Sequence, residues 1–237
     1  MEYHLEEFRE GLKELGIELT EEQIGQFLNF YEFLVEKNRV VNLTAITEFG
    51  AVIKKHFLDS LSLCRVCDLN QNIKIMDLGT GAGFPGIPLK IAYPGLQIVL
   101  ADSLNKRIRF LEELTERLGL KGVETVHARA EELGRNKKYR EQSDVCVSRA
   151  VAHLSSLSEY CLPLVKKGGA FIAYKSGEAD GEIAEAGRAV SILGGQIENT
   201  DRFEMYGQRR TLIVIRKQKK TPPLYPRKAG TPTKMPL

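Results

Sequence analysis

The sequence contains little cysteine and no long hydrophobic run. Four cysteines in 237 residues are too few for a disulfide scaffold, so a reducing, cytoplasmic setting is expected. No apolar stretch approaches the roughly 20 residues that span a bilayer. The acidic first residues also lack the pattern of a signal peptide. We therefore expect a protein without a membrane partner, and no feature of the sequence requires more than a monomer.

The sequence also lacks a complete metal-binding pattern. Cys64 and Cys67 have the spacing of zinc ligands, but no second pair follows them. A structural zinc site uses four such ligands. We expect no bound metal.

Acidic residues are missing from one end of the chain. Residues 205–237 contain nine Lys or Arg and no Asp or Glu, whereas residues 1–204 contain 25 basic and 31 acidic residues. This asymmetry indicates a polyanionic partner near the C-terminus, although a solubilising tail would have the same composition. The candidate RNA contacts are Arg209, Arg210, Lys219, Lys220, Arg227 and Lys228.

Short apolar runs alternate with amphipathic segments from residue 73 onward. Strands are expected at 73–77, 97–101, 123–127, 144–148, 169–174, 196–203 and 210–216, and helices at 85–92, 104–118, 153–166 and 179–193. Such alternation predicts an α/β fold with a doubly wound, mainly parallel, seven-stranded sheet over residues 71–216. The last two strands are joined by a short turn near Gly207, so they should pair antiparallel at an edge.

Two segments flank this domain. Residues 1–70 show helical spacing and are expected to form an N-terminal helical extension, including a helix capped by Thr20 and Gln23 and another over 49–67. Residues 217–237 contain five prolines, which disfavour helices and sheet ladders alike. We expect them to form an extended basic tail.

Residues 75–86, with the sequence IMDLGTGAGFPG, predict a ligand-binding turn. Glycines let the backbone turn sharply and approach a ligand, and a helix N-terminus behind them offers unpaired N–H groups. The spacing Gly81-x-Gly83-x-x-Gly86 matches the dinucleotide fingerprint. Asp102 lies 21 residues after Gly81, which is the position at which this fingerprint has an acidic residue that binds the ribose. This pattern predicts a nucleotide-type cofactor at the sheet edge.

Two details favour S-adenosylmethionine over NAD as that cofactor. Asp77 adds negative charge before the turn, which suits a sulfonium better than a pyrophosphate, and Phe84-Pro85 places an aromatic where a pyrophosphate would need access. Glu131 follows the third strand and could accept from an adenine edge or be a solvated acid. An NAD(P)-dependent oxidoreductase and a non-catalytic, ribosome-associated RNA-binding module remain as alternatives.

Further motifs run along nearly the whole chain. They are Asn42-Leu43-Thr44-Ala45-Ile46, His56-Phe57-Leu58-Asp59-Ser60-Leu61, Asp77 through Pro88, Asp102-Ser103-Leu104-Asn105-Lys106-Arg107, Arg129-Ala130-Glu131, Ser148-Arg149-Ala150-Val151-Ala152 and Tyr225-Pro226-Arg227-Lys228-Ala229-Gly230-Thr231-Pro232. With these motifs the chain resembles the ribosomal RNA small-subunit methyltransferase G family, also called glucose-inhibited division protein B. The glycine turn is general to class I methyltransferases, whereas the tail and the Ser-Arg-Ala-Val-Ala segment are specific to this family.

The resemblance implies N7 methylation of one guanosine in the 530-loop of 16S ribosomal RNA, with S-adenosylmethionine as methyl donor. The partner would be the RNA, the small ribosomal subunit or its assembly intermediate. By position, the implied cofactor contacts are Gly79, Phe84, Ala130, Glu131 and Arg149, to which the logic of the fold adds Gly81 and Asp102.

Guanine N7 carries a free lone pair, so its methylation needs no general base. The sequence has no Asn/Asp-Pro-Pro-Tyr tetrad for an exocyclic amine and no Pro-Cys nucleophile for a pyrimidine. We therefore expect catalysis by orientation, without an essential acid or base. Arg149 could contact the cofactor, order the target nucleotide, or pair with Asp144 or Glu159. His56 and Asp59 are expected to form a structural polar pair.

Overall fold

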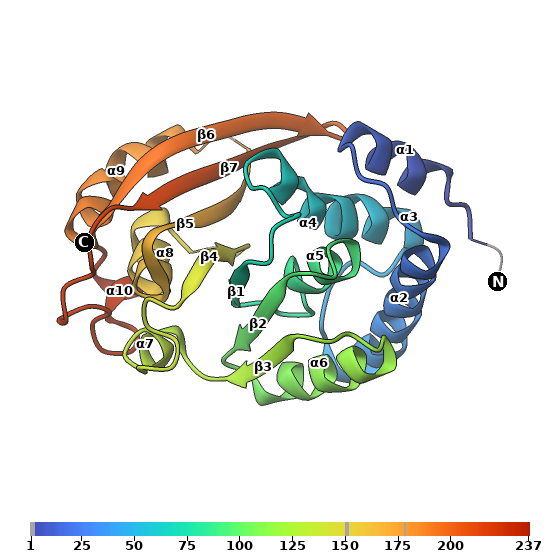
Figure 1. Cartoon of the computed structure of the whole chain (residues 1–237), viewed down its shortest axis with the longest axis horizontal. Helices are drawn as coiled ribbons and strands as arrows, with labels where there is room; N and C mark the ends of the chain where they lie inside the picture. The colour runs from blue at the N-terminus through green and yellow to red at the C-terminus, as the bar shows by residue number, and fades with distance from the viewer. Residues whose placement is uncertain (1–2, 150–151, 178) are drawn as a thin grey trace.

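Seven strands form one sheet in a computed structural model that describes residues 3–149, 152–177 and 179–237 (Figure 1). The strands are β1 (Lys74–Leu78), β2 (Gln97–Asp102), β3 (Val123–His127), β4 (Ser143–Ser148), β5 (Val165–Ser176), β6 (Gly195–Met205) and β7 (Gln208–Lys217). Their order is β3-β2-β1-β4-β5-β7-β6. Pairs among β1 to β5 are parallel, and β7 runs antiparallel to both β5 and β6. The predicted fold class is confirmed.

Helices cover both faces of this sheet (Figure 1). They are α1 (Glu6–Glu14), α2 (Glu21–Val41), α3 (Phe49–Val52), α4 (Asp59–Leu61), α5 (Gly86–Ala92), α6 (Asn105–Arg117), α7 (Ala130–Leu133), α8 (Leu154–Cys161), α9 (Asp180–Ile192) and α10 (Thr231–Lys234). The N-terminal helix α2 packs with α5 and α6 on one face, whereas α8 packs with α9 and α10 on the other.

The N-terminal helices share a hydrophobic core with the sheet. Helix α2 begins at Thr20, whose side chain and that of Gln23 form the predicted capping box. Its buried Phe30 stacks on Phe84 of the glycine turn, with ring centroids 5.1 Å apart. One cluster of buried residues therefore runs from the first helices to the sheet. Residue 70 is thus a boundary in sequence pattern and not between two hydrophobic cores.

Several elements differ from their sequence predictions. The helix expected over 49–67 is divided into α3, a π-helical turn (Ile53–Leu58), α4 and a 3₁₀ turn (Ser62–Arg65). Helix α8 ends at Cys161 rather than 166, because Pro163 lacks the N–H that an α-helix needs and a 3₁₀ turn (Leu162–Leu164) follows.

The C-terminal tail packs on the domain instead of leaving it. Arg140 donates to the carbonyl oxygens of Thr221 and Tyr225 at 2.8 Å, and Arg135 donates to that of Pro226. The tail is not wholly extended, since α10 forms one helical turn that packs on α8. Pro232 is tolerated there because the first turn of a helix does not use its N–H.

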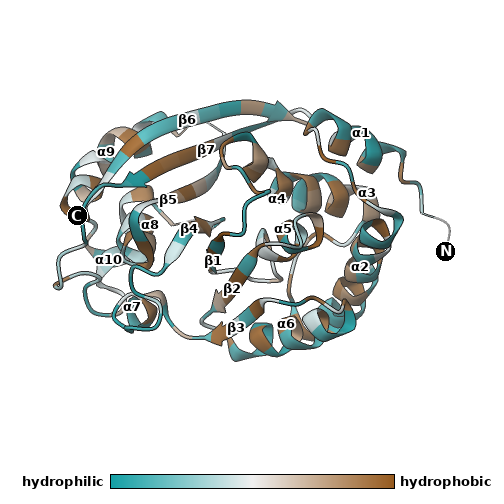
Figure 2. Cartoon of the chain, in the orientation of Figure 1, coloured by the Kyte–Doolittle hydropathy of each residue, from teal (hydrophilic) through white to brown (hydrophobic). Residues whose placement is uncertain are grey.

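Hydropathy follows these layers: β7 carries a hydrophobic run in the sheet interior, whereas the edge strand β6 is mostly hydrophilic (Figure 2). Among the described residues, no helix has both the length and the apolar character needed to cross a membrane.

Candidate active site

The site lies where the strand order reverses, between β1 and β4. In a doubly wound sheet, ligands bind in the crevice at the carboxyl ends of strands at such a point. The glycine turn follows β1, and Arg149 follows β4. Ser148 ties the two strand ends together, because its hydroxyl donates to the carbonyl of Leu78 at 2.9 Å.

The glycine turn presents open backbone to a ligand. Gly79 and Gly81 have φ of 75° and 61°, in the left-handed region that favours glycine. No described atom lies within 4 Å of where a Cβ would stand at either position. The turn therefore has the free space that a bound cofactor would fill.

Asp77 closes this turn onto the start of α5. Its Oδ2 accepts from the Thr80 hydroxyl at 2.7 Å and from the Gly86 N–H at 2.8 Å, while Oδ1 has no hydrogen-bond partner among the described residues. Burial raises the pKa of Asp77 to about 6. The expectation that Asp77 chiefly adds charge for a cationic ligand is thus incomplete, because one oxygen serves the turn itself.

The Phe84 ring does not stand over the helix start. It is buried and stacks on the His56 ring, with centroids 4.4 Å apart and planes at 18°. The steric argument that Phe84 excludes a pyrophosphate is therefore wrong. Its side chain joins the glycine turn to the N-terminal helices.

Asp102 lies beside the turn, where backbone N–H groups hold its carboxylate. Asp102 accepts from the N–H of Gly81 at 3.0 Å and of Leu104 at 2.9 Å, and it pairs with Arg107 at 3.1 Å. The N-cap of α6 is Leu104.

Glu131 lies in the first turn of α7 and is buried, which contradicts the alternative of a solvated acid. Its Oε1 accepts from the N–H of Gly230 in the tail at 2.9 Å. The neighbouring Ala130 is the first residue of the same helix. The tail therefore contacts the residue that the sequence assigned to the adenine edge.

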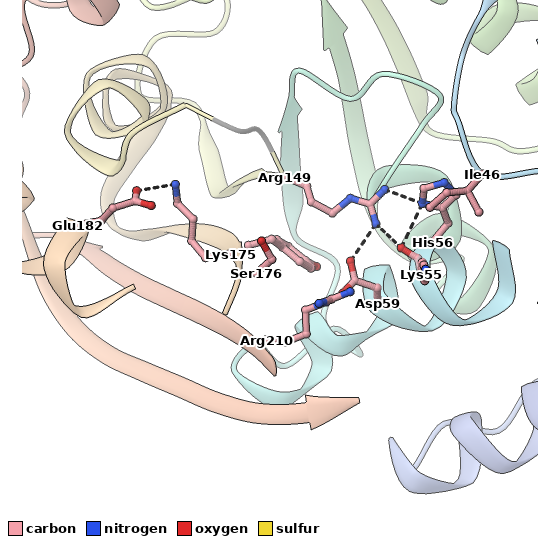
Figure 3. A pocket seen from close by; sticks show the side chains of 10 residues that line it. Ile46, Lys55, His56, Asp59, Arg149, Lys175, Ser176, Glu182 and Arg210 are labelled. Carbon is pink, nitrogen blue, oxygen red and sulfur yellow. Dashed lines mark hydrogen bonds and ion pairs between the residues drawn. The ribbon is translucent and has the colours of Figure 1, made fainter. Parts of the chain in front are cut away.

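Arg149 points across the site to the N-terminal segment (Figure 3). Its Nη1 donates to Asp59 Oδ2 at 2.9 Å and to the carbonyl of Lys55 at 3.0 Å, and its Nη2 lies 3.1 Å from His56 Nδ1. The alternative pairings with Asp144 or Glu159 are wrong, since those acids pair with Lys166 and Arg227. The next two residues of this motif, Ala150 and Val151, lie outside the described residues.

A cavity of about 340 Å³ opens beside Arg149 (Figure 3). Its lining residues are Ile46, Lys55, His56, Asp59, Arg149, Tyr174, Lys175, Ser176, Glu182 and Arg210. Four of them are cationic and two anionic, so the lining favours a negatively charged ligand. The sequence did not assign His56 and Asp59 to a site, although a His and an Asp one helical turn apart at the end of a helical segment were a usable signal.

The family follows from the comparison with known proteins. A family model described as GidB, rRNA small subunit methyltransferase G, matches residues 23–213. The chain is 53% identical over 97% of its length to a Ribosomal RNA small subunit methyltransferase G of Lachnoclostridium phytofermentans, of which it covers 96%. The corresponding protein of Bacillus subtilis is 48% identical, with 99% of each chain covered. The chain belongs to the rRNA small subunit methyltransferase G family. The family indicated by the sequence motifs is confirmed.

Solved structures with lower identity share the fold. A SAM dependent methyltransferase from Aquifex aeolicus gives a TM-score of 0.52 at 16% identity, covering 70% of this chain and 92% of that one. TrmN from Thermus thermophilus gives a TM-score of 0.53 at 16% identity, covering 70% and 53%. At these identities the likeness concerns the fold alone.

The basic residues that the sequence offered as RNA contacts divide into two groups in this family member. Arg210 pairs with Asp59 at 2.6 Å, and Arg227 forms a bidentate pair with the buried Glu159. The other four have exposed side chains and are Arg209, Lys219, Lys220 and Lys228. The ion pairs of Arg210 and Arg227 contribute to the packing of the site and the tail.

His56 and Asp77 should make opposite contributions to the pH dependence of stability. Burial and the Arg149 charge lower the pKa of His56 to about 4, so acidification below about 6.5 protonates the unfolded chain first and destabilises the fold. Because the pKa of Asp77 is raised to about 6, acidification from about pH 6 to about pH 4 protonates the folded chain first and stabilises the fold.

We therefore expect His56→Gln to be relatively stabilised, and Asp77→Asn relatively destabilised, by a change from pH 7 to pH 5. Each difference from the wild type should be about 1–2 kcal/mol, measured by urea unfolding at both pH values. Parallel pH profiles for the wild type and both variants would contradict these assignments.

Proposed function

We propose that this chain transfers a methyl group from S-adenosylmethionine to N7 of a guanosine in the 530-loop of 16S ribosomal RNA, in the cytoplasm. The observation that carries the proposal is the open glycine turn beside a cationic cavity, in a member of the rRNA small subunit methyltransferase G family. The turn would hold the methyl donor and the cavity would receive the nucleotide.

The residues present fit S-adenosylmethionine. The open backbone at Gly79 and Gly81 leaves room for it, and the unpartnered Oδ1 of Asp77 offers an acceptor. Asp102, which accepts from the Gly81 N–H of the turn, would also accept from the ribose hydroxyls. Glu131 and Ala130 would meet the adenine, and Phe84 would contribute backbone rather than its ring. When bound, the donor supplies a methyl group activated by a sulfonium.

The chain's own contribution is orientation. An in-line methyl transfer requires three collinear atoms, and such positioning supplies on the order of 7–11 kcal/mol of the barrier in well-oriented reactions. Guanine N7 is unprotonated at neutral pH, so no side chain has to remove a proton from it. Because N7 lies in the deep groove of an A-form duplex, the target must be unpaired or turned out of the helix.

Transfer of a labelled methyl group tests the proposal. The protein is incubated with labelled S-adenosylmethionine and either naked 16S RNA or small subunits, and the modified base is mapped. We expect label at N7 of one guanosine, and the comparison identifies which RNA state is the substrate. Label at another atom, or none with either substrate, would refute the proposed function.

A thermal-shift comparison tests the cofactor separately from the RNA. S-adenosylhomocysteine at 100 times its Kd should stabilise the fold by about 2.7 kcal/mol, whereas NADH should not. The oxidoreductase alternative predicts the reverse. A protein that binds neither would be the non-catalytic RNA-binding module.

A further inference from the structure

The π-helical turn Ile53–Leu58 lies against the end of β4 and faces Arg149. Single π-helical turns occur frequently at functional sites. This one directs the carbonyl of Lys55 and the ring of His56 at the guanidinium, and Asp59 follows it directly with its carboxylate (Figure 3). Three groups from one short segment therefore hold one side chain that lies about 90 residues further along the chain.

These contacts fix Arg149 without using all its donors. A guanidinium has five N–H groups. Both hydrogens of Nη1 and one of Nη2 serve the three contacts. As far as the described residues go, the Nε hydrogen and one Nη2 hydrogen remain for a ligand. Arg149 lines the cavity with its side chain only 21% exposed, so these donors have a defined direction.

His56 holds Arg149 as a neutral acceptor. Its Nε2 lies 2.9 Å from the Thr44 hydroxyl, and its Nδ1 lies 3.1 Å from both Arg149 Nη2 and the carbonyl oxygen of Lys55. Because a guanidinium can only donate, Nδ1 is the acceptor in the contact with Arg149. Burial and the Arg149 charge keep the pKa of His56 near 4, so the ring stays neutral at neutral pH. Asp59 lies between two guanidinium groups and partly neutralises their charge. Its Oδ2 pairs with Arg149 and its Oδ1 pairs with Arg210.

We propose that the π-helical turn positions Arg149 to donate a hydrogen bond to O6 of the target guanine, and so selects guanine over adenine. This inference rests on the proposed function. Guanine carries the acceptor O6 beside N7, whereas adenine carries an amino donor at that place. A donor from Arg149 matches guanine, opposes adenine and leaves the N7 lone pair free for the methyl group. His56 and Asp59 are positioning residues that act through Arg149.

The test compares guanine with 2-aminopurine at the target position of otherwise identical small-subunit RNA. The analogue keeps N7 and the 2-amino group but lacks O6. The wild type should prefer guanine by about tenfold to a hundredfold in kcat/KM. His56→Phe keeps a flat ring against Phe84 but removes the Nδ1 acceptor, and it should bring this preference toward unity. His56→Asn, with an acceptor near the place of Nδ1, should restore much of it.

Asp59→Asn provides a second variant, in case His56→Phe does not fold, and it should also lower the preference. Affinity for S-adenosylhomocysteine, measured by calorimetry, should stay near the wild-type value in all three variants. Arg202→Ala is the matched control, because Arg202 of β6 forms an exposed ion pair with Asp180, the first residue of α9. It should leave the preference unchanged.

Equal losses of kcat/KM on both bases would show a structural role only and overturn the inference. Lost S-adenosylhomocysteine affinity with an unchanged base preference would assign Arg149 to the cofactor, and also overturn it. A wild type that methylates guanine N7 without any preference over 2-aminopurine overturns the inference but not the proposed function. A wild type that methylates neither base overturns both.

Discussion

Replacing Arg227 with alanine is expected to lower the free energy of unfolding by about 3–5 kcal/mol. Its guanidinium pairs with Glu159 through contacts of 3.0, 3.1 and 2.7 Å, and the Glu159 side chain is only 1% exposed. The variant would leave a buried carboxylate without its counter-charge, which is costly because the interior cannot solvate it. Urea unfolding measures the loss.

Arg216→Ala is the matched control for this prediction. Arg216 makes the same kind of bidentate pair with Glu198, but the two side chains are 37% and 46% exposed. An exposed pair contributes about 0–1 kcal/mol. The double variant Arg227→Met with Glu159→Leu should be less destabilised than Arg227→Ala, because no charge is left buried. Equal losses in Arg227→Ala and Arg216→Ala would contradict the structural role of the tail.

Arg227→Ala should also weaken cofactor binding. The tail that Arg227 anchors supplies the Gly230 N–H that holds Glu131. We expect the affinity for S-adenosylhomocysteine to fall in Arg227→Ala and to remain unchanged in Arg216→Ala, as measured by calorimetry on folded protein. An unchanged affinity in both would separate the tail from the cofactor site.

Gly86→Ala is expected to destabilise the fold by about 3 kcal/mol. A Cβ at this position would stand 2.3 Å from Leu100 Cδ2 and 2.8 Å from Asp77 Oδ2, so these two buried side chains or α5 itself would have to move. The displaced Asp77 would also release the turn, so the affinity for S-adenosylhomocysteine should fall as well.

Gly25→Ala is the control, because it is expected to raise the stability of the fold instead of lowering it. Gly25 lies inside α2, where no described atom is within 4 Å of the added Cβ. Alanine there should stabilise the fold by about 0.5–1 kcal/mol, because glycine loses more freedom on entering a helix. A stability loss in Gly86→Ala no larger than about 0.5 kcal/mol would show that α5 accommodates the methyl group.

The local sequence pattern was enough to predict the sheet and the position of the glycine turn. The alternation of apolar runs with amphipathic helices, the short turn at Gly207 and the glycine spacing after β1 each depend on neighbours within a few residues. Element ends were less accurate, as at α8, where the effect of Pro163 was missed. The role of Phe84 was misjudged and that of Asp77 was described only in part, because burial and partner groups decide where a side chain points.

The sequence by itself determined the doubly wound class, the family and the position of the glycine turn, since these follow from periodicity and from motifs of adjacent residues. Only the tertiary structure decided that His56 and Asp59 hold Arg149, and that Arg227 holds Glu159 instead of facing solvent. The partners in these contacts lie 68 to 93 residues apart. Their meeting depends on how helices pack on the two faces of the sheet, and no local spacing encodes that arrangement.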